Sequence, residues 1–123
     1  QGLHVVSDRF TDATFAYQGG GRGVVDEKIA QLESWVQGSL KPDLTIILDV
    51  PLEVSVARIE GSRKKDRFEQ EQASFFERVR TAYHQRAASA PERYALIDSN
   101  QPREQTQAEI EAVLNRLFGF QAA

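Results

Sequence analysis

The sequence of 123 residues contains no cysteine, which excludes disulfide bonds and thiolate metal sites. No apolar run approaches the roughly 20 residues of a membrane-spanning helix, and no secretion signal opens the chain. The net charge of −3 is unlike the basic balance of a typical nucleic-acid binder. The chain is 41% hydrophobic, enough for a core, and 27% charged. This composition predicts one soluble cytoplasmic domain over residues 1–123, with no nucleic-acid or membrane partner.

Three short apolar runs predict β-strands at residues 3–7, 44–50 and 94–97. The second run, LTIILDV, is nearly continuous rather than alternating, which is typical of a strand that is buried on both faces of a parallel sheet. Helical patterns lie between the runs. The alternation of strands and helices predicts an α/β fold with right-handed crossovers.

Helices are predicted where apolar residues recur on one face. Asp26 is a predicted N-cap, and Pro51 and Gly61 are predicted to begin and end a further helix. The three apolar faces are Ile29, Leu32, Trp35 and Val36, then Phe76, Val79, Tyr83 and Ala87, and then Ile110, Val113, Leu114 and Leu117.

An aspartate ends each predicted strand: Asp8, Asp49 and Asp98. Ligands of open α/β sheets bind outside the carboxyl ends of the strands, so these carboxylates are expected at that edge. For Asp49 and Asp98 we favour the simpler interpretation that each caps the next helix. Asp8 differs because Arg9 follows it. A carboxylate beside an arginine favours a phosphate site, in which the guanidinium binds phosphate oxygens and the carboxylate holds Mg²⁺.

The segment that follows this pair, TDATFAYQGGGRG, carries side chains that suit a nucleoside. Thr14, Tyr17 and Gln18 share one face of a helical turn. A hydroxyl and an amide there can read the edge of a base, and the tyrosine ring can lie against a base or sugar. The glycines at 19–21 and 23 are expected to break the helix. The alternative interpretation of this segment is a helix end with a glycine loop and a hydrogen-bonded tyrosine.

A cluster of positive charge lies between two predicted helices, in the stretch ARIEGSRKKDRFE. From Arg58 to Arg67, five cations outweigh two acids, which gives a local charge of +3. Such a loop suits closure over a polyphosphate during phosphoryl transfer, although a solvated charged loop is the alternative. The cations are Arg58, Arg63, Lys64, Lys65 and Arg67.

Four blocks in order resemble the bacterial thymidylate kinases, from their middle to their C-terminus: DRFTDATFAYQGGGRG, KPDLTIILDVP, KKDRFEQE and FFERVRTAY. The resemblance covers nearly all 123 residues. It implies a P-loop-kinase-like three-layer fold with a parallel sheet, and phosphorylation of thymidine monophosphate (dTMP) to dTDP by ATP and Mg²⁺. It also implies a homodimer.

Residue roles follow from the same resemblance. Asp8 would serve the Mg²⁺ and phosphate region, and Arg9 would hold the phosphate of dTMP. Thr14 and Gln18 would bind the thymine ring, and Tyr17 would lie against the sugar. On the ATP side, Arg58 and the loop Ser99, Asn100 and Gln101 would border the adenine. A lid at about residues 59–69 would supply the cations Arg63, Lys64 and Arg67 to the transferring phosphoryl group, and its register leaves open the choice between Arg63 and Lys64.

The family's phosphate loop, GxxxxGK[ST], does not occur in this sequence. In the family, this loop lies near the N-terminus. The first strand of the family's sheet lies directly next to the strand that residues 3–7 resemble. The sheet is therefore expected to lack its first strands, and the strand at 3–7 to lack its direct partner. We hypothesise that the chain is the C-terminal part of a longer kinase, and expect these 123 residues alone to lack kinase activity.

Two other functions stay open at this stage. Another nucleoside monophosphate kinase of the same fold would share the chemistry and differ in base preference, for which Thr14 and Gln18 favour thymine. A non-catalytic remnant would bind nucleotide without turnover. Trp35 either faces a second subunit or belongs to the core.

Overall fold

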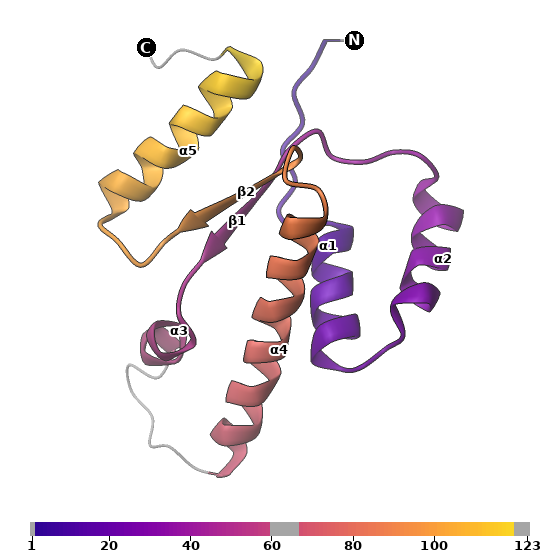
Figure 1. Ribbon diagram of the computed structural model, residues 1–123, viewed down its shortest axis with the longest axis vertical. Coiled ribbons are helices and arrows are strands. Elements are labelled where there is room, and N and C mark those ends of the chain that lie inside the picture. Colours follow the sequence, from indigo (N-terminus) through magenta and orange to yellow (C-terminus); the bar gives the residue numbers. More distant parts are fainter. Residues whose placement is uncertain (1, 60–66, 120–123) are drawn as a thin grey trace.

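The structure is a computed structural model that describes residues 2–59 and 67–119. From residue 11 onward, its helices and its two strands follow the chain in the order expected from the sequence (Figure 1). They are α1 (Thr11–Thr14), the π-helix η1 (Phe15–Gly21), α2 (Asp26–Gln37), β1 (Thr45–Asp49), α3 (Leu52–Ile59), α4 (Arg67–Ser89), β2 (Tyr94–Asp98) and α5 (Arg103–Phe118).

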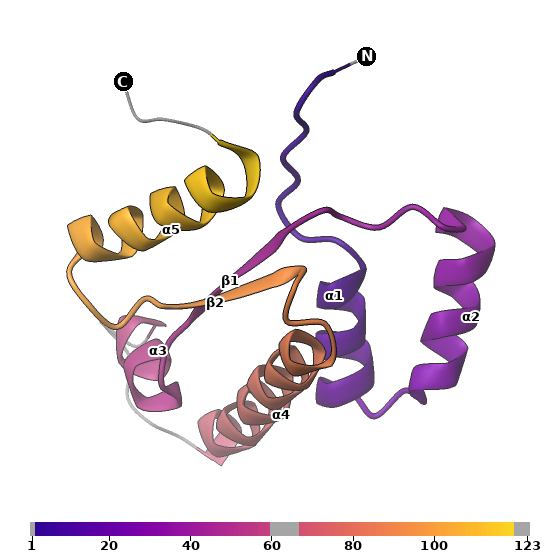
Figure 2. The ribbon, with the colours of Figure 1, turned by 45° about the horizontal axis from the view of Figure 1, so that its top comes forward.

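The sheet consists of β1 and β2, which run parallel in a register from Thr45 opposite Tyr94 to Asp49 opposite Asp98. The α/β fold with a parallel sheet and both of these strands are therefore confirmed. The expected burial of β1 on both faces is wrong, because Ile47 is 8% exposed whereas its neighbour Leu48, on the other face, is 55% exposed. Helix α5 lies over one face of the sheet, and α4 with α1 lies over the other (Figure 2). The face toward α4 carries more of the core.

The predicted strand at residues 3–7 does not form. This segment is extended and exposed, and Val5 and Val6 are 89% and 96% exposed. A strand is held by hydrogen bonds to a neighbour, and β1 and β2 bond to each other. The predicted strand is therefore wrong in this structure, and the lack of a pairing partner for it was expected from the sequence.

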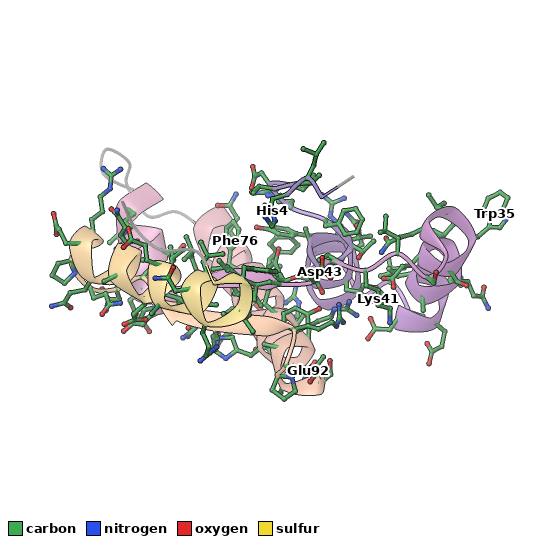
Figure 3. All side chains as sticks on the ribbon, turned by 90° about the horizontal axis from the view of Figure 1, so that it is seen from above. His4, Trp35, Lys41, Asp43, Phe76 and Glu92 are labelled. Atoms are coloured by element: carbon green, nitrogen blue, oxygen red, sulfur yellow. The ribbon has the colours of Figure 1, made fainter. Side chains whose placement is uncertain are left out.

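The predicted apolar faces are buried to different degrees. On α4, Val79 is 4% exposed and Phe76 is half-buried, as expected of a helix that packs on a sheet. On α2 only Ile29 is buried, and Trp35 is 85% exposed and projects away from the molecule (Figure 3). Trp35 is therefore not a core residue in this structure. The predicted N-cap is also wrong by one residue, because Val25 occupies the cap position and Asp26 begins the helix.

Gly19, Gly20 and Gly21 do not break their helix, whereas Gly23, with a φ of +75°, lies directly after its end as expected. The helix continues to Gly21 in a wider turn, so that the Arg22 N–H donates to the Tyr17 carbonyl at 3.0 Å, five residues back. Their small size serves packing instead. A Cβ at Gly20 would lie 2.7 Å from the Ala82 Cβ, and one at Gly21 would lie 2.4 Å from the Phe75 ring. The glycines therefore let η1 approach α4 closely.

Candidate functional site

Arg9 has a backbone conformation that few arginines adopt. Its φ is +64°, in the left-handed region, and the Ser7 hydroxyl donates to its carbonyl at 3.0 Å. Its guanidinium lies 5.4 Å from the centroid of the Tyr17 ring. This distance is within reach of a cation–π contact. The structure thus brings together two of the residues that the sequence assigned to the substrate.

Two aromatic residues of α4 flank Tyr17. The centroids of Phe75 and Tyr83 lie 6.1 and 6.4 Å from that of Tyr17, and the Tyr83 ring meets it edge-on. Burial, and then the nearby Tyr17, raise the pKa of Tyr83, while Arg9 opposes the shift. The sequence predicted Tyr83 only as an apolar helix position and did not single out Phe75. The repeated aromatic residues in FFERVRTAY were the available signal.

Thr14 and Gln18 lie on the same helical segment as Tyr17. Thr14 ends α1 and is exposed, and Gln18 lies one residue beyond Tyr17 in η1 and is half-buried. Their spacing of four residues keeps them near one face, since the segment stays helical. The exposed Thr14 side chain is available to a ligand.

A second group forms beyond the carboxyl ends of the strands. Arg58, in the last turn of α3, donates to the Ser99 carbonyl at 3.2 Å. The Asn100 N–H donates to the Asp98 carboxylate at 2.8 Å, and the Gln101 amide donates to the Asp98 carbonyl at 2.7 Å. Four of the residues assigned to the adenine side therefore meet at one place.

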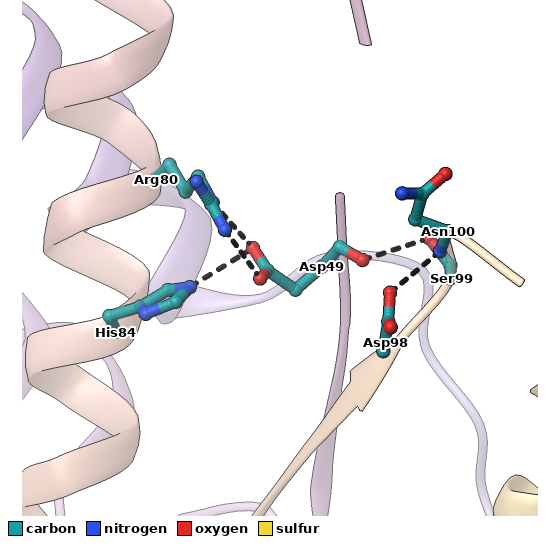
Figure 4. Close-up of polar contacts among 6 residues, drawn as sticks. All are labelled: Asp49, Arg80, His84, Asp98, Ser99 and Asn100. Carbon is teal, nitrogen blue, oxygen red and sulfur yellow. Dashed lines mark hydrogen bonds and ion pairs between the residues drawn. The ribbon is translucent and has the colours of Figure 1, made fainter. Parts of the chain in front are cut away.

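Asp49 anchors this edge to α4 (Figure 4). Arg80 holds its two carboxylate oxygens at 2.9 and 3.0 Å, and His84 Nε2 lies 3.0 Å from one of them. The hydrogen bond from Arg80 is the main reason that the pKa of Asp49 is lowered, with burial opposing it and His84 adding to it. Asp49 thus binds α4, and Asp98 bonds Asn100, so the predicted helix caps are wrong for both.

Asp12 is the one buried charged residue in the part of the chain that the structure describes, at 5% exposed. Arg86 Nε donates to its carboxylate at 2.7 Å, and the Tyr94 hydroxyl donates to the same oxygen. The Arg86 guanidinium also lies 4.0 Å from the Phe15 ring centroid. Burial is the largest single influence and lowers the pKa of Arg86, but the hydrogen bond and charge of Asp12, together with Tyr94, outweigh it and leave that pKa raised. The sequence analysis missed this network, because its members lie far apart in the chain.

Asp8 is exposed and belongs to no strand. Within residues 2–59 and 67–119 no cluster of three metal-binding side chains occurs. Mg²⁺ that travels with substrate phosphates needs only one or two carboxylates from the protein, and an exposed Asp8 fits that need. The lid cations Arg63 and Lys64 lie outside the described residues, and so does the side chain of Arg67.

A polar pocket of about 360 Å³ opens beside Thr11 and Asp12 at the start of α1. Arg86, Glu33 and Lys41 also line it. None of the residues that the sequence assigned to nucleotide binding lines it. The side chains assigned to nucleotide binding, rather than this mostly polar pocket, therefore mark the candidate site.

None of the helices in the described residues has the length and apolar character needed to cross a membrane. A parallel sheet with helices on both faces and a polar group beyond its carboxyl edge defines an α/β protein, consistent with a P-loop-kinase-like fold. The sequence matches the thymidylate kinase family over residues 1–110. The chain belongs to the thymidylate kinase family.

Similar proteins carry the same family name. The chain is 68% identical over 118 residues to a protein named thymidylate kinase from Neisseria meningitidis serogroup A, and 67% identical to one from Neisseria gonorrhoeae (strain NCCP11945). A thymidylate kinase from Ectopseudomonas mendocina is 56% identical. Each alignment covers 96% of this chain, but only 57%, 57% and 56% of these relatives. The chain thus spans a little over half the length of the curated relatives it matches.

Proposed function

We propose that the protein that contains this chain transfers the γ-phosphoryl group of ATP to dTMP, giving dTDP in the cytoplasm. The observation that carries this proposal is the contact between Arg9 and Tyr17 at the start of the helix that bears Thr14 and Gln18. A cation that would bind phosphate, an aromatic wall and polar groups that would read the base therefore lie along one short segment. Membership of the thymidylate kinase family supports the same substrate.

The residues would divide the substrate between them. Arg9 would bind the phosphate of dTMP through its fork of N–H donors. Tyr17, held between Phe75 and Tyr83, would lie against the sugar. Thr14 and Gln18 would donate to and accept from the thymine edge. A rigid aromatic wall beside two polar groups would fix the orientation of the base.

The group beyond the strands would take the other nucleotide. Arg58 together with Ser99, Asn100 and Gln101 would border the adenine of ATP, because Arg58 already bonds this loop. Arg63, Lys64 and Arg67 remain proposed as lid cations that stabilise charge on the transferring phosphoryl group. Asp8 would hold Mg²⁺ directly or through water, and the ion would neutralise charge on the phosphates. Positioning and charge stabilisation supply most of such catalysis.

The experiment that tests this function compares Arg9→Ala and Gln18→Ala in the natural full-length protein. We expect Arg9→Ala to weaken dTMP binding by calorimetry at least tenfold, with ATP binding retained. Gln18→Ala should lower the ratio of activity on dTMP to activity on deoxyuridine monophosphate. Arg22→Ala, which removes an exposed arginine just after the same helix, is the matched control.

The outcomes separate the alternatives. Turnover that prefers another monophosphate would indicate a different nucleoside monophosphate kinase. Nucleotide binding without turnover would indicate a non-catalytic binding protein. Unchanged dTMP binding by Arg9→Ala would remove Arg9 from the phosphate site.

We also propose that the protein is a homodimer, with α2 at the interface. Leu32, Trp35, Val36 and Leu40 form an apolar face that is 59–85% exposed. Exposed apolar patches of this kind mark interaction surfaces. Trp35→Glu should convert the dimer to a monomer in sedimentation analysis, whereas Glu27→Gln, on the same helix, should not. A monomeric unaltered protein would refute the proposal.

A further inference from the structure

The helix that would read the base is held at both ends by arginines of α4. At its start, Arg86 binds the Asp12 carboxylate at 2.7 Å. At its end, Arg78 donates to the Gly21 carbonyl through Nε at 3.3 Å and Nη2 at 3.0 Å. Thr14, Tyr17 and Gln18 lie between these two attachments. The position of the three proposed substrate residues relative to α4 therefore depends on them.

The Asp12 carboxylate is bonded to more than one helix or strand. It accepts hydrogen bonds from Arg86 on α4 and Tyr94 on β2, and the Thr45 hydroxyl of β1 lies at 3.5 Å. Bonds from three elements fix both the rotation of the helix and its position along its axis. An apolar contact of the same size would permit sliding, because hydrophobic attraction has no direction.

Stability alone does not explain a buried ion pair. Removing two charges from water is costly, and well-packed apolar residues in the same place are often as stable or more stable. The best-attested benefit of such pairs is to specify one register among several. Register matters here, because the segment after Asp12 becomes π-helical, a geometry that is rare and is often found at functional sites.

We propose that Asp12 and Arg86 are positioning residues for the dTMP site, which set the place of the base-reading helix against α4. The inference rests on the proposed function and extends it. The ion pair touches no substrate atom in this scheme. It acts through Thr14 and Gln18, whose distance from the base it fixes.

The test replaces the network by apolar residues of similar size, in the natural full-length protein. The variant Asp12→Leu with Arg86→Met, Tyr94→Phe and Thr45→Val removes the buried charges together with both hydroxyls that bond Asp12. We expect its thermal midpoint to be retained or raised. We also expect the KM for dTMP to rise about 10- to 100-fold, since small displacements of positioning groups have effects of this size. The preference for dTMP over deoxyuridine monophosphate should fall, and the KM for ATP should not change.

Arg93→Met is the matched control. Its guanidinium lies 5.3 Å from the Tyr94 ring centroid, at the same end of α4, so it removes a neighbouring arginine but leaves the Asp12 carboxylate bonded. We expect the KM for dTMP to stay at the unaltered value. A stable apolar variant with an unchanged KM and base preference would overturn the inference. An equal rise in the KM values for dTMP and ATP would overturn it as well.

A second variant decides the question if the apolar variant does not fold. Arg86→Lys keeps the positive charge but loses the planar group that stacks on Phe15 and donates along a fixed direction. We expect a folded protein with a several-fold higher KM for dTMP. A folded Arg86→Lys protein with an unchanged KM and base preference would overturn the inference. An unaltered protein that neither binds nor phosphorylates dTMP would instead refute the proposed function, and the inference with it.

Discussion

The helices η1 and α2 follow one another in the chain but meet the rest of the molecule in different ways. Helix η1 packs closely on α4 through Gly20 and Gly21, where even a methyl group would clash. Helix α2 carries an apolar face at helical spacing, yet it buries only Ile29 and leaves Trp35 exposed. The buried side chains of Phe15 and Ala16, together with small residues and polar attachments, thus hold the proposed substrate helix. An apolar face is buried only where another surface covers it.

The largest effect expected from this comparison separates two residues of α2. Ile29→Ala should destabilise the full-length protein by about 2–5 kcal/mol, because Ile29 is 4% exposed and its loss leaves a cavity. Leu32→Ala is the control: Leu32 is 59% exposed, so its loss removes little buried area. Urea denaturation measures both. Equal losses would show that α2 is covered along its whole apolar face in the protein.

A smaller effect is expected at the close approach of η1 to α4. Gly20→Ala should destabilise by about 1–3 kcal/mol, because the added methyl would overlap the Ala82 Cβ at 2.7 Å and the Arg78 carbonyl oxygen at 2.9 Å. Neither atom can rotate away. Ser34→Ala on the exposed side of α2 should be nearly neutral in the same denaturation experiment. A neutral Gly20→Ala would mean that the two helices do not touch closely.

The smallest effect concerns the half-exposed contact of Asp49 with Arg80 and His84. The pKa of Asp49 is lower in the folded chain, so its stabilisation is fully present above the ordinary value of 3.8 and is lost as the pH falls through the folded value. Arg80 is 40% exposed, so solvent limits this contribution to less than about 1 kcal/mol.

Asp49→Asn should therefore lower stability at neutral pH and flatten its decline below pH 3.8, as measured by denaturation across that range. Removal of the exposed Asp43 carboxylate by Asp43→Asn controls for net charge. A variant that declines as steeply as the unaltered protein would place the acid sensitivity elsewhere.

Local sequence patterns predicted the helices and strands well where the spacing of apolar residues alone determines the element. The apolar run LTIILDV became β1, and Val79 with its neighbours gave the buried face of α4. Arg9 and Tyr17 were both selected from their residue types, and the structure places them in contact. Residues assigned to the adenine side, Arg58 and Ser99, also meet.

Patterns failed where the outcome depended on a partner far away in the chain. Residues 3–7 look like a strand, but a strand exists only when another one bonds to it. Glycines usually end a helix, but Gly20 and Gly21 continue one because α4 lies against them. The spacing of apolar residues on α2 could not tell which surface, if any, would cover Trp35.

By itself, the sequence determined the α/β order, the parallel character of the sheet and the chemical character of the proposed site, which follow from residue type and local periodicity. The family followed from the resemblance of four sequence blocks to known proteins. Only the tertiary structure decided that Asp12 binds Arg86 and Tyr94, and that Asp49 binds Arg80. Each of these bonds joins residues at least 31 positions apart, so only the folded backbone brings their atoms together.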